Sequence, residues 1–397
     1  MPGMLPGWKR ALQSVGVIDL AIGQPARSLL PMDKLARASA HRFSKFGGWD
    51  AQEMLQYSGA RGTEEFSAAL AKFLSHNYGM PVHAEELMVV NGSSGGLELV
   101  CSVFARAGET VLVEEASYFL AFNIFRSHGL NVVPVRSKEG ELCVLALREA
   151  ITKHAPSMLY LIPTFSNPTG TVMTPELRRE VLEACTDGGV LIVADDVYQM
   201  LHFGARPPAP INALDGGCAS ISIGSFSKIL CPGMRVGWIH SSADRIHKLA
   251  SRPFIQSGGG LAPFTTAHLL SMLELGLQQQ HLDLLCSEYA ARCRALCEAL
   301  RTHAPSCRFA QPEGGYFVWV TLPEGLTAAA LHEHLRDSSA GVAVLPGGRC
   351  RVVELEDPQA DACVRLCYAF YEVDELVEAA KRLGLAISEL TRRMRAL

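Results

Sequence analysis

Apolar positions along the chain follow two different spacings. Short and nearly continuous apolar runs stand at 87–90, 110–114, 158–163, 190–194 and 220–224. Segments with three- and four-residue apolar spacing separate these runs, and the clearest, at 65–79, places Phe66 and Leu70 on one helical face. Strands that are apolar on both faces and alternate with helices predict a mostly parallel central sheet covered by helices, an α/β fold.

A different pattern begins after residue 265. Residues 276–304 read as one long amphipathic helix, and three apolar segments beyond it, "GGYFVWV", "VAVLP" and "RLCYAFY", predict strands before a last helix at 373–384. This part of the chain therefore predicts a smaller α+β domain. We assign residues 48–275 to the large domain, and residues 1–47 with 276–397 to the small one.

The composition limits the classes of function. Of the 397 residues, 48% are hydrophobic and 19% are charged, which is typical of a chain with a large buried core. A net charge of -4 without a basic stripe argues against nucleic-acid binding. No apolar run reaches the length of a membrane span, and "MPGMLPGWKR" lacks the apolar core of a signal peptide, so we expect a cytoplasmic protein.

Twelve cysteines raise the question of a metal or disulfide framework, but no pair stands at CxxC spacing. Cys293 and Cys297 are four positions apart in a predicted helix, and Cys363 and Cys367 are four apart in a predicted strand. In a reducing compartment such cysteines mostly serve as small buried hydrophobes. We therefore predict no metal site.

The stretch "VVNGSSGGLEL" (89–99) leads from a predicted strand into a predicted helix. Free backbone N–H groups and the helix dipole converge at such a junction, so it forms either an anion cradle or a plain strand-to-helix turn. It fits neither GxGxxG nor the P-loop lysine pattern, which argues against a nicotinamide oxidoreductase or a triphosphate-binding protein.

Two further motifs stand at the ends of predicted strands. "PTFSNPTG" (163–170) presents Asn167 where open α/β sheets bind ligands, or it is an ordinary turn. "VADDVYQML" (193–201) ends an apolar strand at Asp195. Because an unpaired buried charge is costly, Asp195 either caps a helix or faces a buried cation.

The stretch "SFSKILCPGMRVGW" places Lys228 among small and apolar residues, with Arg235 seven positions later. Together with "NPTG" and the D-x-x-Y of Asp195 and Tyr198, it resembles the fold-type-I, pyridoxal-phosphate-dependent aminotransferases of the class I/II family. The resemblance runs from "LAIGQP" to "VRLCYAF" and is nearest to the aminoadipate/kynurenine aminotransferases, which share the "SFSK" spelling. The lysine-to-arginine interval differs by one residue from that of the aspartate aminotransferases, which argues against a strict aspartate specificity.

The resemblance implies a role for each residue around the cofactor, pyridoxal 5'-phosphate. Lys228 would form a Schiff base with it and then shuttle a proton during the reaction. Asp195 would pair with the pyridinium nitrogen, and Tyr198 and Asn167 would hydrogen-bond the phenolic oxygen of the ring. Tyr118 would stack on the ring face, or it is a core aromatic residue.

Several positions match the family's phosphate-binding residues. These are Ser93, Ser94, Ser225, Ser227 and Arg235. Ser94 stands where relatives often carry glutamine or alanine. Tyr57, in "LQYSGARG", matches a tyrosine that reaches the phosphate from the neighbouring subunit, so the resemblance implies a homodimer with shared active sites; a surface tyrosine is the alternative.

Other residues match positions that bind the substrate. Arg365 would grip the substrate α-carboxylate, because its planar fork suits a carboxylate bidentately; a structural salt bridge is the alternative. Gly23, Tyr316 and Asn167 resemble further substrate-side positions. The glycines and aromatic residues of 41–54 indicate a mobile cover over the site.

The implied activity moves an amino group from an L-amino acid to a 2-oxo acid, with 2-oxoglutarate as the expected acceptor, by a ping-pong mechanism. Aromatic, aminoadipate and branched aliphatic donors all remain open. A β-lyase, or a synthase that makes a cyclopropane amino acid, is the second hypothesis on the same cofactor. A non-catalytic regulator built on this fold is the third, and it is disfavoured because the pattern begins by residue 20.

Overall fold

The computed structural model describes residues 16–44, 54–138, 140–337, 340–352 and 361–395. Its centre is a seven-stranded sheet in the order β2-β10-β9-β8-β7-β3-β4. The strands are β2 (Leu87–Val90), β10 (Gly237–His240), β9 (Ser220–Ser225), β8 (Leu191–Asp195), β7 (Met158–Leu161), β3 (Thr110–Glu114) and β4 (Asn131–Val135). Only β10 runs antiparallel to its neighbours in this sheet, so the predicted mostly parallel sheet is confirmed.

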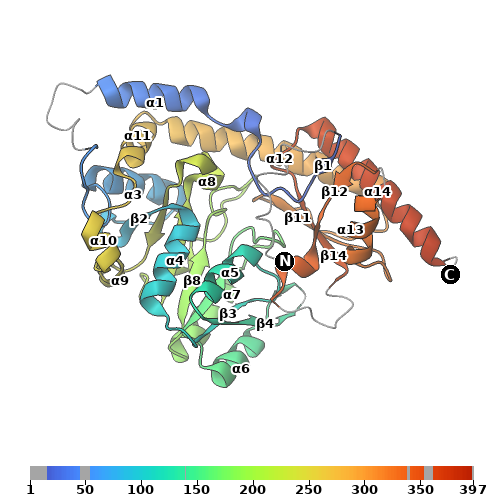
Figure 1. Ribbon diagram of the computed structural model, residues 1–397, viewed down its shortest axis with the longest axis horizontal. Helices are drawn as coiled ribbons and strands as arrows, with labels where there is room; N and C mark the ends of the chain where they lie inside the picture. Colours follow the sequence, from blue (N-terminus) through green and yellow to red (C-terminus); the bar gives the residue numbers. More distant parts are fainter. Residues whose placement is uncertain (1–15, 45–53, 139, 338–339, 353–360, 396–397) are drawn as a thin grey trace.

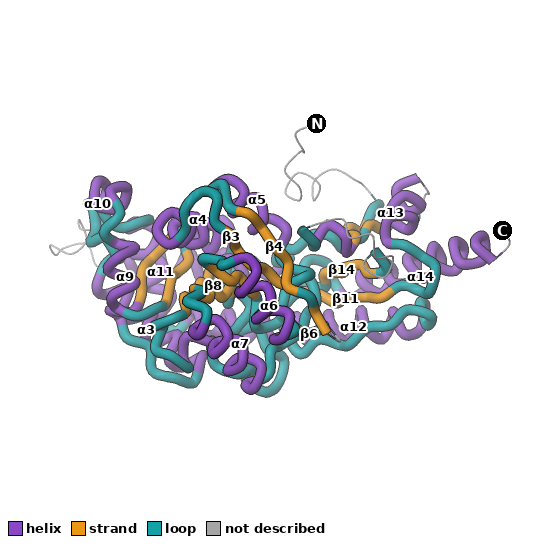
Figure 2. The backbone as a smooth tube through the Cα atoms, turned by 90° about the horizontal axis from the view of Figure 1, so that it is seen from below, coloured by secondary structure: helices purple, strands orange, loops and turns teal. Residues whose placement is uncertain are grey.

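Helices cover both faces of this sheet because successive strand residues point to opposite sides. Val111 and Val113 of β3 pack with α4 (Gly92–Phe104) and α5 (Phe119–Ser127), whereas Leu112 packs with α6 (Val144–His154) and α7 (Pro175–Asp187). Figure 2 shows α4 and α5 on one side of the strands. Two separate apolar clusters therefore sandwich the sheet, as expected for strands without a polar face.

Local sequence signals set the bounds of the helices. The side chain of Thr63 accepts a hydrogen bond from the amide of Phe66 at the start of α3 (Glu64–Tyr78), which ends at Gly79 with φ of 69°. Thr174 caps α7 in the same way, and Pro175 occupies its first turn.

The second lobe combines a three-stranded sheet with two long helices (Figure 1). The sheet has the order β11-β14-β13, and the elements are β11 (Phe317–Thr321), β14 (Cys363–Cys367), β13 (Leu345–Pro346), α12 (Leu277–His303), α13 (Ala328–Asp337) and α14 (Val373–Arg395). The predicted α+β composition of this lobe is confirmed.

Two predictions for this lobe are wrong in detail. The segment "VAVLP" is two strands and not one, because β12 (Val342–Ala343) pairs with β1 (Ile18–Asp19) while β13 pairs with β14. The last helix does not end at Gly384. A Cβ at this position would lie 2.0 Å from the carbonyl oxygen of His303, so the glycine permits close approach of α14 to the end of α12.

The N-terminal residues contact both lobes. β1 extends the small lobe, and α1 (Met32–Ser44) lies along α11 (Pro263–Glu274), where His41 is 3.0 Å from the hydroxyl of Ser271 (Figure 1). The domain boundaries proposed above stay a prediction. Of the predicted cover, residues 41–44 form the end of α1, and residues 45–53 lie outside the described residues.

All twelve cysteines are free thiols, and Cys293, Cys297, Cys363 and Cys367 are buried, as predicted for small hydrophobic side chains. The described residues hold no group of three or more His, Cys, Asp or Glu side chains arranged to bind a metal ion. Among the helices of the described ranges, none is long and apolar enough to cross a membrane.

Candidate active site

A cavity of about 300 Å³ lies at the carboxyl ends of the parallel strands, where the loops of the large lobe meet β11 and β14. Most of the residues predicted for the site line it. They are Gly23, Ser93, Ser94, Tyr118, Asn167, Asp195, Tyr198, Ser227, Lys228, Arg235 and Arg365. The parallel strands bring these distant segments together because their carboxyl ends share one edge of the sheet.

Lys228 lies in α8 (Phe226–Ile229), the short helix that follows β9. Its Nζ donates a hydrogen bond of 2.8 Å to the carbonyl oxygen of Gly23 and lies 5.3 Å from the centre of the Tyr316 ring. Burial, together with the nearby charge of Arg365, lowers the pKa of Lys228 to about 8. A substantial fraction of the amine is therefore neutral near physiological pH.

Asp195 ends β8 inside the protein, and the next helical element after it begins at Ile211, so the helix-cap alternative is wrong. Its Oδ2 accepts a hydrogen bond of 2.8 Å from the hydroxyl of Tyr160. Its Oδ1 is buried without a hydrogen-bond partner in the described part of the chain. Burial raises the pKa of Asp195 to about 6, although the bond from Tyr160 lowers it. Because buried polar atoms are normally paired, this oxygen is suited to accept a hydrogen bond from a ligand or to face a cation.

The start of α4 forms an anion cradle with Arg235. Asn91 provides no side-chain cap, so the amides of the first turn are left for a ligand. Nη1 of Arg235 lies 3.4 Å from the Oγ of Ser227, and its Nη2 lies 3.3 Å from the carbonyl oxygen of Asn91. Gly92 adopts φ of 73°, and a Cβ there would lie 2.6 Å from the Arg235 guanidinium.

Ser225 does not line the cavity. It is buried, and its Oγ accepts a hydrogen bond of 3.1 Å from the amide of Ser227 and donates one of 3.0 Å to the Ser227 hydroxyl. Ser225 therefore positions Ser227, which itself lines the cavity.

Arg365 reaches the cavity from β14 and is only 4% exposed. Its Nη1 donates to the Oδ1 of Asn167 at 2.8 Å, and its Nη2 donates to the carbonyl oxygen of Ala21 at 2.7 Å. The guanidinium carbon lies 4.1 Å from the centre of the Phe317 ring. No carboxylate pairs with Arg365 among the described residues, so the salt-bridge alternative finds no support.

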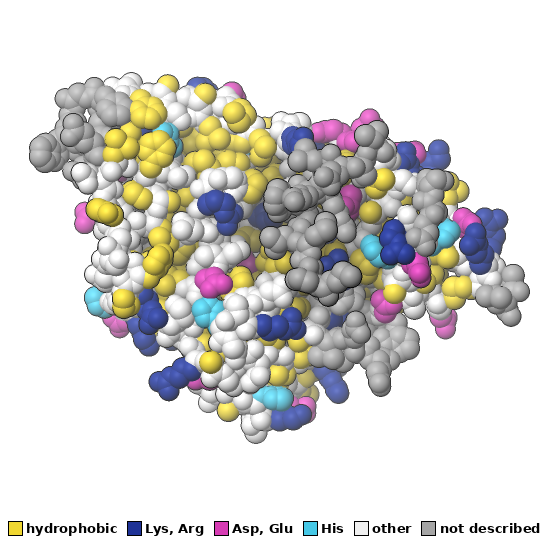
Figure 3. Space-filling model, viewed as in Figure 1, with side chains coloured by type: hydrophobic (Ala, Val, Ile, Leu, Met, Phe, Trp, Pro, Cys, Tyr) yellow, Lys and Arg dark blue, Asp and Glu magenta, His cyan; other side chains and the backbone are white. Residues whose placement is uncertain are grey.

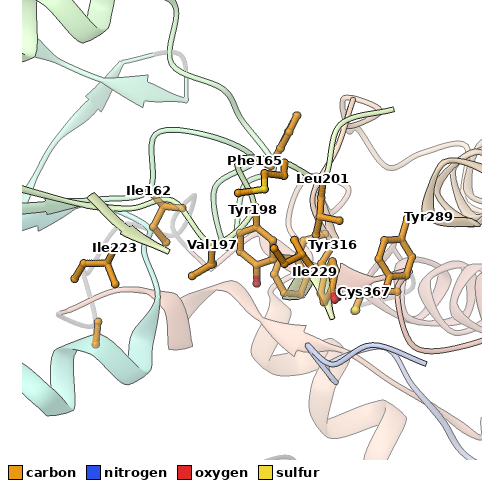
Figure 4. Packing of buried hydrophobic residues seen from close by; sticks show 14 of the residues in the cluster. Ile162, Phe165, Val197, Tyr198, Leu201, Ile223, Ile229, Tyr289, Tyr316 and Cys367 are labelled. Carbon is orange, nitrogen blue, oxygen red and sulfur yellow. Dashed lines mark hydrogen bonds between the residues drawn. The ribbon is translucent and has the colours of Figure 1, made fainter. Parts of the chain in front are cut away.

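Tyr198 and Tyr316 belong to one aromatic group (Figure 4), and the Nζ of Lys228 lies 5.9 Å from the centre of the Tyr198 ring. The Tyr316 ring centre lies 5.3 Å from that of Tyr198 and 5.1 Å from that of Tyr289. Tyr316 is fully buried and is not among the cavity-lining residues; its hydroxyl donates to the carbonyl oxygen of Lys228 at 3.0 Å. Within this chain it thus holds the backbone of the lysine.

The other two aromatic residues predicted for the site lie in different places, one in the cavity and one on the exposed surface. Tyr118 precedes α5 and lines the cavity. Tyr57 is 81% exposed and lines a separate open hollow with Thr63 and Gln256. The structure of one chain therefore does not bring Tyr57 to the cavity.

Three residues at the site were not predicted from the sequence, namely Tyr160, Phe317 and Arg349. The first supports Asp195, and the other two line the cavity. A signal for Tyr160 was present, because a tyrosine inside a buried apolar strand needs a partner for its hydroxyl.

Known proteins are similar to this chain over nearly its whole length. A 2-aminoadipate transaminase of Thermus thermophilus is 32% identical over 384 residues, which make up 95% of this chain and 92% of that protein. The crystal structure of a multiple substrate aminotransferase from Thermococcus profundus has a TM-score of 0.86 and 28% identity, covering 98% of this chain and 96% of that one.

A second solved structure carries a derivative of the cofactor. It is LysN, the α-aminoadipate aminotransferase of Thermus thermophilus, complexed with N-(5'-phosphopyridoxyl)-L-leucine; it has a TM-score of 0.81 and 30% identity over 98% of this chain and 100% of that one. The family model of the class I and II aminotransferases matches residues 15–383. The resemblance is thus confirmed: this chain belongs to the class I and II aminotransferases of fold type I, and it is a pyridoxal-phosphate-dependent transaminase.

Proposed function

We propose that the enzyme uses this cavity to transfer the amino group of an L-amino acid to a 2-oxo acid in two half-reactions. Glutamate and 2-oxoglutarate form one of the two exchanging pairs. One observation carries the proposal. A single cavity is lined by Lys228, by Asp195 and by Arg365. In the described part of the chain, the Oδ1 of Asp195 has no hydrogen-bond partner and Arg365 pairs with no carboxylate. The bound cofactor supplies an aldehyde that condenses with amines and a ring that withdraws electrons from the substrate α-carbon.

The residues present fit pyridoxal phosphate. The unpartnered Oδ1 of Asp195 is suited to accept a hydrogen bond from the ring nitrogen, and its negative charge favours the protonated ring. Ser93, Ser94, Ser227 and Arg235 offer donors for the phosphate at the start of α4. Gly92 leaves room beside Arg235 that no other residue would leave.

Lys228 would bind the cofactor covalently through Nζ and, once displaced by substrate, would move a proton from the substrate α-carbon. Its pKa, which burial lowers to about 8, suits both roles, because each needs the neutral amine. Tyr198 and Asn167 would donate to the ring oxygen, and Tyr118 would cover one face of the ring.

Arg365 would bind the substrate α-carboxylate. It is already aligned by Asn167 and by the carbonyl oxygen of Ala21, and its Nε is buried without a partner in the described ranges. A pre-positioned fork of this kind loses little side-chain entropy on binding. Gly23, which accepts the Lys228 hydrogen bond, and Tyr316, which holds the lysine backbone, would act beside it.

We also propose a homodimer whose sites are completed by Tyr57 of the second copy. Tyr57 is 81% exposed, and Phe254 and Phe264, in α10 (Pro253–Gly258) and α11, are 72% and 48% exposed. Figure 3 shows hydrophobic side chains gathered at the end of the molecule where α1 and α11 lie. Exposed aromatic surface of this kind favours a protein interface. The cytoplasmic location stays a prediction.

Spectroscopy of the purified holoenzyme tests the function. Glutamate should bleach the yellow cofactor, and 2-oxoglutarate should restore the colour, with parallel lines in double-reciprocal plots of initial rates. Failure of every amino donor to bleach it would sink the proposal. Release of pyruvate and ammonia from a cysteine conjugate without any 2-oxo acid would favour the lyase.

Borohydride reduction tests the lysine separately. It should fix the cofactor mass on the tryptic peptide that contains Lys228, and Lys228→Ala should take up no label. Labelling of any other peptide would overturn the assignment of Lys228, whatever the substrate proves to be.

A further inference from the structure

One basic side chain at the cavity has no part in the proposed function. Arg349 belongs to the short turn η6 (Gly347–Cys350) and lines the cavity together with Phe119 and Leu345. Its guanidinium carbon lies 5.9 Å from the centre of the Phe119 ring. Within the described residues, none of its N–H groups donates to an acceptor, and no carboxylate forms an ion pair with it.

The turn that carries Arg349 is fastened to the large lobe. The amide of Ser117 donates to the carbonyl oxygen of Cys350 at 2.9 Å, and Arg351 forms an ion pair of 2.7 Å with Glu115. Both contacts reach the loop that leads into Tyr118. These two contacts hold the backbone of the turn at the rim of the cavity, although the side chain of Arg349 is exposed.

The charges around the cavity leave Arg349 available for an anion. Lys228, Arg235 and Arg365 have roles in the proposed function, and Arg349 is the fourth basic side chain among the described residues that line the cavity. Asp19 also lines it, but its Oδ1 accepts a hydrogen bond of 3.0 Å from the amide of Ala21, and no ion pair joins it to Arg349 within the described chain.

We infer that Arg349 determines substrate specificity by binding the distal carboxylate of dicarboxylic amino acids and 2-oxo acids. The guanidinium fork offers two parallel donors to a carboxylate, and Phe119 and Leu345 provide apolar surface for the methylene groups between the two carboxylates. The inference rests on the proposed function, because the substrate side chain can reach Arg349 only if Arg365 holds the substrate α-carboxylate.

The test compares two isosteric donors, glutamate and glutamine, in the first half-reaction of the holoenzyme. Arg349→Gln should lower the ratio of kcat/KM for glutamate to that for glutamine by about tenfold or more, since it removes charge-assisted hydrogen bonds from one substrate only. Arg136→Gln, an exposed arginine outside the cavity, is the matched control and should leave the ratio unchanged. An unchanged ratio in Arg349→Gln would overturn the inference.

A binding measurement separates this inference from the proposed function. Glutarate and pentanoate, two unreactive acids of equal chain length, are titrated into the holoenzyme by calorimetry. The wild type should bind glutarate at least about tenfold more tightly, and Arg349→Gln should remove most of this difference. Equal affinities in the wild type would refute the role of Arg349 even if glutamate bleaches the cofactor. Should Arg349→Gln fail to fold, Arg349→Lys should still reduce the preference several-fold, because an ammonium cannot form the paired bonds.

Discussion

At the scale of single residues, burial shifts the pKa values of the two groups to which we assign the chemistry. It lowers the pKa of Lys228 to about 8 and raises that of Asp195 to about 6, in each case by disfavouring the charged form. The hydroxyl of Tyr160 offsets part of this effect at Asp195. The site thus holds a partly neutral amine and a desolvated carboxylate before any ligand arrives.

The carboxylate of Asp195 should destabilise the apoenzyme. A carboxyl whose pKa is raised in the folded state adds stability below its unfolded value of 3.8, and that stability is lost as the pH rises through about 6. At pH 8 the buried charge should therefore cost about 2–3 kcal/mol. Asp195→Asn should raise the urea midpoint of the apoenzyme at pH 8.

The same variant provides its own control. At pH 4 both proteins carry a neutral group at position 195, so their urea midpoints should nearly coincide. The transaminase rate of the variant holoenzyme should fall by about a hundredfold or more, because the cationic ring loses its partner. A variant that is less stable than the wild type at pH 8 would contradict this account of Asp195.

At the scale of elements, the site depends on junctions where a strand ends and a helix begins. β2 leads into α4 at Gly92, and β9 leads into α8, which carries Lys228. Each junction leaves amides or side chains at the carboxyl edge of the sheet. The left-handed conformation of Gly92 brings the backbone within reach of Arg235, which no larger residue would permit.

Gly92→Ala should therefore weaken cofactor binding more than it weakens the fold. The added Cβ would lie 2.6 Å from the Arg235 guanidinium and would displace it from the cradle. We expect a loss of stability of about 1–2 kcal/mol from the backbone strain and at least about a tenfold rise in the dissociation constant of pyridoxal phosphate. Fluorescence titration of the apoenzyme measures the second quantity.

Gly108→Ala is the matched control. Gly108 also has a positive φ, of 90°, but nothing lies within 4 Å of a Cβ built there. It should lose similar stability and keep its affinity for the cofactor. If both variants lose affinity equally, strain rather than the contact with Arg235 explains the effect.

At the scale of the whole molecule, two lobes enclose one cavity, and we propose that a second copy completes it. Arg365 and Phe317 come from the small lobe, and Lys228 comes from the large lobe. Tyr57 does not line the cavity of its own chain, and it lies on exposed surface. The proposed homodimer would bring it to the phosphate of the other subunit.

Subunit complementation tests this proposal. Lys228→Ala should abolish the site of its own chain, and Tyr57→Ala should weaken the site of the other. A mixed dimer of the two variants should regain one native site, so refolding an equal mixture should restore about a quarter of the wild-type activity if subunits pair at random. Activity no higher than the mean of the two separate variants would show that Tyr57 serves its own chain or none.

Hydrophobic spacing was enough to predict β2, β3, β7, β8 and β9 and the helices between them, but it did not predict the antiparallel strand β10. The runs at 87–90, 110–114 and 220–224 are buried on both faces of the sheet, so most of their residues are apolar or small and the sequence alone reveals them. Predictions failed where a contact distant in the sequence decides the outcome. "VAVLP" divides between two sheets because β1 pairs only with its first two residues. Gly384 lies inside a helix and does not end it, because the end of α12 packs so closely there that a side chain would not fit.

The sequence by itself determined the family, because the motifs around Asn167, Asp195 and Lys228 stand in the order that the family shares, and it predicted the chemical groups of the site. Only the tertiary structure showed which groups are satisfied. It paired Tyr160 with Asp195, turned Tyr316 toward the backbone of Lys228 and left Arg349 without a hydrogen-bond or ion-pair partner in the described chain. Such pairings join residues far apart in the sequence, and hydrophobic periodicity reports only which face of each element is buried, not what that face meets.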